Sequence, residues 1–195
     1  MRNHTEGDTG DKNVLVHVPP LDDKGDAATL GFLTQTPPRE TNVLVISYIR
    51  SADEWLRTWL DYAGESPAHL GIIRVGETTR SATTASASDS PSHSPSVIET
   101  VANPRNLTDL GITISEYISD WDENPYQTCV CFDSLTALLQ YTENVQTAFR
   151  FLHTVVGRVK TANARACYQI TPDAHDDQTV ALITGLFDTV LEHKG

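Results

Sequence analysis

The chain has little positive charge and no long apolar run. Of its 195 residues, 14 are Lys or Arg and 26 are Asp or Glu, which gives a formal net charge of -12. A surface with this balance repels phosphate backbones and anionic lipid, so we expect neither nucleic acid nor a membrane as a partner. No apolar stretch approaches the roughly 18 residues of a membrane span, and the first twelve residues contain no apolar signal segment. We therefore expect a soluble, cytoplasmic protein.

Cysteine is also scarce, and the usual hydrolase signatures are missing. The three cysteines, Cys129, Cys131 and Cys167, lie inside apolar segments, which fits buried reduced thiols better than a disulfide framework. Cys129 and Cys131 share one face of an expected strand, and a metal clip formed by them is the less favoured alternative. No GxSxG-like nucleophile elbow occurs. Buried thiols in an acidic chain also lack the electropositive setting of a reactive cysteine.

The acidic residues that are present have a particular balance. Asp outnumbers Glu, and Arg outnumbers Lys. This balance predicts adaptation to a high-salt cytosol, because molar salt shortens the Debye length to about 3 Å and screens the repulsion between carboxylates. An ordinary acidic cytosolic protein is the alternative.

Apolar runs alternate with amphipathic stretches from residue 13 onward. Continuous apolar runs are typical of parallel strands that are covered on both faces. They predict strands at residues 13–18, 42–48, 69–75, 97–101, 127–132, 165–170 and 189–192. Spacing and capping signals predict helices at residues 27–34, 51–64, 106–121, 135–141, 144–159 and 176–186. This alternation predicts an α/β fold with three αβα layers and a mainly parallel sheet.

The polar segments set the expected domain boundaries. Residues 1–12 are charged and without periodicity, so we expect a disordered tail. Residues at about 79–96 are rich in Ser, Thr and Ala, and we expect a flexible insertion there. A single domain is then expected over residues 13–195, because the chain is too short to divide with confidence.

An apolar strand, Asp133-Ser134 and a Leu-rich helix follow one another in TCVCFDSLTALLQY. This segment resembles the Walker B strand and following helix of the KaiC, RecA and GvpD class of ATPases. NVLVHV and NVLVISY stand where that class has its first two strands. The chain is also similar to a haloarchaeal group of RecA-superfamily relatives labelled transducer-like (HTR-like), in the runs LGIIRVGETTRSA, DLGITISEYISDW, VCFDSLTALLQY, AFRFLHTVVGRVK and DAHDDQTVALITGLFD. The resemblance implies a RecA-like P-loop NTPase fold.

The nucleotide-binding residues of that class are largely missing. A phosphate loop needs glycines, a Lys and a Ser or Thr, but residues 19–26 read PPLDDKGD, with Lys24 as the one cation among three aspartates. The class places a water-activating Glu just beyond its second strand. Residues 48–51 read YIRS there, and the next carboxylate, Asp53, falls in a helix-capping sequence. Loss of a general base usually lowers a rate by about 10²–10⁴.

Asp133 would organise Mg²⁺ in the class that the chain resembles. A single carboxylate is weak support for a magnesium site, so the favoured interpretation is that Asp133 and Ser134 cap the helix from Leu135. We retain Asp133, Ser134 and Lys24 as vestigial cofactor-binding residues. The turn His175-Asp176-Asp177 suggests either a metal site or a helix cap, and the cap is favoured.

The sequence therefore predicts a RecA-like domain without an intact P-loop and with no catalytic residue. We expect a regulatory or signal-transduction module that binds a protein partner in a halophilic archaeon, and we expect neither a cofactor nor a metal. The alternative is an ATP-binding protein or weakly active ATPase that uses an irregular loop around Lys24 together with Asp133, with ATP and Mg²⁺ as its cofactors.

Overall fold

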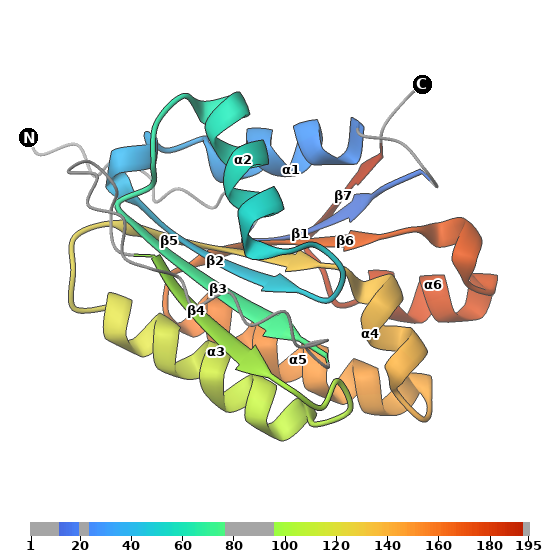
Figure 1. Ribbon diagram of the computed structural model, residues 1–195. Coiled ribbons are helices and arrows are strands. Elements are labelled where there is room, and N and C mark those ends of the chain that lie inside the picture. Colours follow the sequence, from blue (N-terminus) through green and yellow to red (C-terminus); the bar gives the residue numbers. More distant parts are fainter. Residues whose placement is uncertain (1–11, 20–23, 77–95, 193–195) are drawn as a thin grey trace, which may run out of the picture.

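The computed structural model describes residues 12–19, 24–76 and 96–192. Within them, seven strands form one parallel sheet in the order β4-β3-β2-β5-β6-β1-β7 (Figure 1). The strands are β1 Asn13–His17, β2 Thr41–Ser47, β3 His69–Val75, β4 Ser96–Val101, β5 Gln127–Asp133, β6 Arg165–Ile170 and β7 Thr189–Glu192. The expected mainly parallel sheet is thus confirmed.

Six α-helices cover the two faces of this sheet. They are α1 Lys24–Leu33, α2 Ala52–Ala63, α3 Leu107–Trp121, α4 Leu135–Tyr141, α5 Val145–Thr161 and α6 Asp177–Thr184. Buried side chains of α1 and α2 pack on one face, and those of the other four helices pack on the opposite face (Figure 1). The predicted three-layer αβα fold is confirmed, and it is consistent with a RecA-like arrangement. In the described part of the chain, no helix combines the length and apolarity that crossing a membrane requires.

Several boundaries differ from the prediction. Helix α1 begins at Lys24 and not at residue 27. The backbone N–H groups of a first helical turn have no intrahelical acceptor, so polar residues typical of loops can occupy that turn. Helix α6 ends at Thr184, two residues before the expected end. Ser96, expected in the insertion, opens β4. Of the expected tail at residues 1–12 and the expected insertion at about 79–96, residues 1–11 and 79–95 lie outside the described residues. Lys12 is described, and its carbonyl accepts from Ala166 N–H at 2.7 Å.

One hydrophobic core lies under α1 and α2. Trp55 and Trp59 of α2 are buried there, as the helical spacing of the tryptophans predicts. The same core contains Cys129, Cys131 and Cys167, which are free and buried, so the prediction of reduced buried thiols is confirmed.

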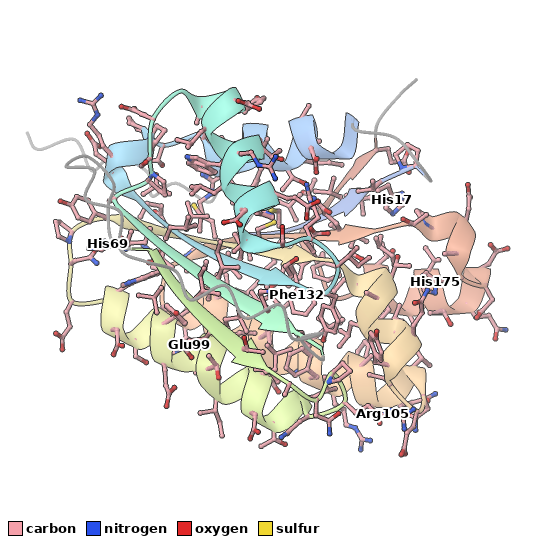
Figure 2. The ribbon with its side chains drawn as sticks, viewed as in Figure 1. His17, His69, Glu99, Arg105, Phe132 and His175 are labelled. Atoms are coloured by element: carbon pink, nitrogen blue, oxygen red, sulfur yellow. The ribbon has the colours of Figure 1, made fainter. Side chains whose placement is uncertain are left out.

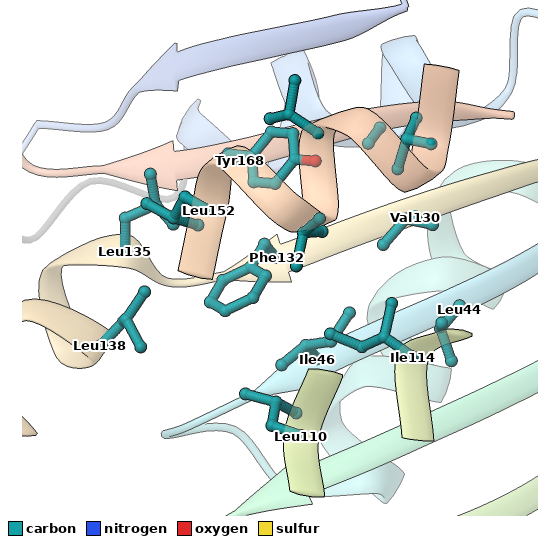
Figure 3. Close-up of a cluster of buried hydrophobic side chains, with 14 of the residues drawn as sticks. Leu44, Ile46, Leu110, Ile114, Val130, Phe132, Leu135, Leu138, Leu152 and Tyr168 are labelled. Atoms are coloured by element: carbon teal, nitrogen blue, oxygen red, sulfur yellow. The ribbon is translucent and has the colours of Figure 1, made fainter. Parts of the chain in front are cut away.

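The second core, on the α3–α6 face, is organised around Phe132 of β5 (Figure 3). Its ring lies 6.1 Å from the ring of Tyr168 and 6.0 Å from that of Tyr48, measured between centroids, and 6.3 Å from that of Phe151. Such aromatic pairs contribute roughly 0.5–1.5 kcal/mol beyond the area they bury. Because Phe132 directly precedes Asp133, this packing fixes the end of β5 where the candidate site begins.

Candidate functional site

The candidate site lies where neighbouring parallel strands send the chain to opposite faces of the sheet. β2 leads to α2 on one face, and its neighbour β5 leads to α4 on the other face. Ligands of open α/β sheets bind outside the carboxyl ends of strands at such switch points. Ser47 and Asp133, the last residues of these two strands, are partners in the strand register. Asp133 therefore stands at the position where a ligand site is expected.

The Asp133 carboxylate is bound by an arginine. Arg50 Nε lies 2.7 Å from Asp133 Oδ2, and Arg50 Nη1 lies 2.8 Å from Asp26 Oδ2. Three separate elements supply these groups: the segment after β2, the end of β5 and the first turn of α1. We call Asp26, Arg50 and Asp133 the ion triad.

The backbone around Arg50 is held on both sides. The Ser47 hydroxyl donates to the Arg50 carbonyl at 2.8 Å, and Tyr48 N–H donates to the Asp133 carbonyl at 2.9 Å. Ser51 then caps α2 in the predicted capping box with Glu54, which is confirmed. The short connection from β2 to α2 thus has little freedom, and it directs the Arg50 guanidinium toward the end of β5.

The charged side chains of the ion triad are shielded from solvent to different degrees. The Asp133 side chain is only 9% exposed, compared with 24% for Arg50 and 31% for Asp26. Burial raises the pKa of Asp133, and the positive charge and hydrogen bond of Arg50 oppose that rise. Burial acts to lower the pKa of Arg50, but the two carboxylates outweigh it and raise that pKa above its usual value. The triad therefore places the Arg50 guanidinium between a buried carboxyl group and a partly exposed one.

The three residues that the sequence predicts as vestigial cofactor-binding residues, Asp133, Ser134 and Lys24, occupy different places in the fold. Ser134 caps α4, since its hydroxyl accepts from Ala137 N–H at 3.3 Å. The prediction that Asp133 also caps this helix is wrong, because its carboxylate binds Arg50 instead. The peptide bond that joins Asp133 to Ser134 is cis. Lys24 opens α1, but its side chain lies outside the described residues.

Sequence reasoning missed the roles of Arg50 and Asp26. In the sequence, Arg50 stands out only because its stretch lacks a Glu, and Asp26 only as one of the aspartates that oppose phosphate binding. A signal was present, since a single arginine lies three residues after a buried strand and directly before a helix cap. Its partner is visible only once β2 and β5 are known to be neighbours.

Two histidines lie near the same end of the sheet (Figure 2). His17 closes β1, and His175 follows β6 with its Nε2 3.2 Å from Thr136 Oγ1. Burial lowers the pKa of His175. Asp176 caps α6 by accepting from Thr179 N–H at 2.9 Å, which confirms the predicted cap. Among the described residues, no three His, Cys, Asp or Glu side chains are grouped so that they could hold a metal ion.

The geometry limits what the triad can do. A divalent cation such as Mg²⁺ needs several oxygen ligands, while the Asp133 carboxylate already has a guanidinium on one oxygen. The segment from Tyr48 to Arg50 carries one cation and no carboxylate. The triad is thus suited to hold α1, β2 and β5 together, with each carboxylate bound to Arg50 through one oxygen.

Comparisons with known proteins agree on the fold and leave the activity open. A solved structure of an uncharacterized protein from Pyrococcus horikoshii, in complex with an unknown peptide, is similar with a TM-score of 0.60 and 11% identity. The match covers 96% of this chain and 80% of that one, and at this identity it shows a shared fold alone. No curated protein matches the chain significantly. A family model does match residues 12–193, and the chain accordingly belongs to this family of unknown function (DUF7504).

Proposed function

We propose that the chain is a non-catalytic RecA-like domain that acts as a regulatory or signal-transduction interaction module. The observation that carries the proposal is the Arg50 guanidinium bound to Asp133 and Asp26. In the ATPase class that the sequence resembles, the carboxylate at the position of Asp133 serves Mg²⁺ and the nucleotide. Here a side chain of the protein supplies the positive charge.

Opening this site for a nucleotide would be costly. Each hydrogen bond to a charged group is worth about 1.5–3 kcal/mol, and Arg50 makes one to each carboxylate. Since 1.4 kcal/mol corresponds to about a tenfold change in affinity, displacing Arg50 from both would weaken binding by about 10²-fold or more. Asp26 would also stand beside the approaching phosphates. These two effects support a domain that retains the fold without the nucleotide.

A thermal-shift assay tests the proposal against nucleotide binding. We expect millimolar ATP with Mg²⁺ to leave the melting temperature unchanged, both in dilute buffer and in molar salt. The Lys24→Ala variant is the matched control, because Lys24 is the one cation in the PPLDDKGD segment. A rise in melting temperature that Lys24→Ala abolishes would instead support the ATP-binding alternative.

We propose that the interaction with a partner uses surfaces other than the ion triad. The acidic composition supports a halophilic archaeal cytosol as the setting. The similar protein from Pyrococcus horikoshii was crystallised with an unknown peptide. We expect a partner to be recovered by affinity capture from native cytosol at molar salt, equally with and without ATP. Recovery that depends on ATP would contradict a nucleotide-independent module.

A further inference from the structure

Helices α3 and α5 carry opposite charges. α3 has the acidic residues Asp109, Glu116 and Asp120 and neither Lys nor Arg. α5 has Arg150, Arg158 and Lys160 and no acidic residue, although the chain contains 26 of them. Charge is therefore separated between two helices on one face of an otherwise acidic protein.

These two helices border an apolar groove of ≈ 710 Å³ on the outer surface of the α3–α6 layer. Its floor is formed by residues such as Gly111, Phe151 and Val155, and Ile112 on its rim is 53% exposed. The acidic rim includes Glu116 and Asp120, and the opposite rim includes Arg150 and Arg158. We call this surface the α3/α5 groove.

The charges of the groove are largely available to a partner. Within the described part of the chain, no carboxylate lies at ion-pair distance from Arg150 or Arg158. Arg158 donates to the Ser119 hydroxyl at 2.6 Å, which is a neutral partner. Two cations thus border an apolar surface without a counter-charge from the described residues.

We propose that the α3/α5 groove is the interface through which two copies of this chain form a symmetric dimer. A twofold interface requires a patch that is complementary to itself, and this patch contains both the acidic and the basic half. α3 and α5 each connect one parallel strand to the next, so they run in the same direction. A twofold axis along the groove places α3 of each copy on α5 of the other. Both contacts then join acidic to basic residues, around Ile112 and Phe151.

The size of the groove sets the strength of the dimer. Helices of 15 and 17 residues, each about 10 Å wide and rising 1.5 Å per residue, present roughly 500 Å² per copy. Standard interfaces bury about 800 Å² per partner, so the dimer belongs to the weaker, transient class. We therefore expect association that depends on protein concentration. Salt will weaken the contacts between charged rim residues more than the apolar contacts at the floor of the groove.

Charge reversal gives a specific test by sedimentation equilibrium. Wild type should dimerise with rising concentration. We expect Arg150→Glu with Arg158→Glu to be monomeric, and Glu116→Arg with Asp120→Arg to be monomeric as well. An equimolar mixture of the two variants should form a heterodimer, because each contact then again joins opposite charges. Circular dichroism of each variant confirms that it is folded.

A pair of equally exposed isoleucines gives the matched control. Ile112 borders the groove and Ile98 lies on β4, and each is 53% exposed. Ile112→Asp should abolish the dimer while Ile98→Asp retains it. A wild type that is monomeric at every concentration, as a groove made for a different protein would give, overturns the proposal. So does a mixture of the charge-reversed variants that fails to associate. None of these results depends on whether the domain binds nucleotide.

Discussion

Replacing Arg50 by methionine perturbs the ion triad most directly. Methionine keeps much of the side-chain volume but removes the cation, which leaves Asp133 buried and Asp26 unpaired. Removing one partner of a fully buried ion pair costs about 3–5 kcal/mol. Arg50 and Asp26 are partly exposed, so we expect about 2–3 kcal/mol, in the range of hydrogen bonds to charged groups. For a domain of this length that corresponds to a melting temperature lower by about 5–10 °C.

The loss should depend on pH with a definite sign. Burial already raises the pKa of Asp133, and removing Arg50 raises it further. The folded variant then holds a proton on Asp133 more tightly than the unfolded chain does. Its stability deficit relative to wild type is therefore full above the folded pKa and shrinks as the pH falls through it. Denaturant unfolding of both proteins from neutral to acidic pH measures this change.

Two further variants complete the experiment. Arg39→Met removes an exposed ion pair with Glu65 and should leave stability almost unchanged, because solvent screens such pairs. Adding Asp26→Asn and Asp133→Asn to Arg50→Met removes the uncompensated charges and should recover much of the lost stability. The reasoning is refuted if Arg50→Met costs no more than Arg39→Met, or if its deficit grows on acidification.

Two other predictions concern strand β3 and helix α4. In Gly71→Ala, the new Cβ would lie 2.6 Å from Tyr117 Cε1 and 3.1 Å from Leu44 Cδ1, so we expect overpacking that costs about 1–3 kcal/mol in denaturant unfolding. In Ser134→Ala, loss of the acceptor for Ala137 N–H should lower stability by about 1 kcal/mol, while Ser134→Asn should retain it. Equal stability of the Ala and Asn variants would argue against a capping role.

Much of the fold follows from local signals in the sequence. Every strand was predicted within one residue. For the central strands the reason is that buried parallel strands need continuous apolar runs, which polar segments delimit. The start of α2 was equally clear, since Ser51 and Glu54 supply both halves of a capping box. The start of α1 was not, because Gly25 and Asp26 are typical of loops and the helix there is stabilised by its packing against the sheet.

The candidate site was only half predictable. Asp133 was singled out because its segment resembles a Walker B strand, and the structure places it at the end of β5. Its bond to Arg50 could not be predicted, because it joins residues 83 positions apart and depends on β2 lying beside β5. The charge separation of α3 and α5 was readable in the sequence. That the two charged helices border one groove could be seen only in the structure.

The proposed function rests on the claim that Arg50, and not a nucleotide with Mg²⁺, binds the Asp133 carboxylate at the end of β5. Arginine-selective NMR of the Nε–H groups measures this directly. We expect the Arg50 Nε–H signal to exchange slowly with water, to move in Asp133→Asn, and to stay unchanged when ATP and Mg²⁺ are added. A signal that exchanges rapidly, or that shifts with nucleotide as Arg50 leaves Asp133, would contradict the claim.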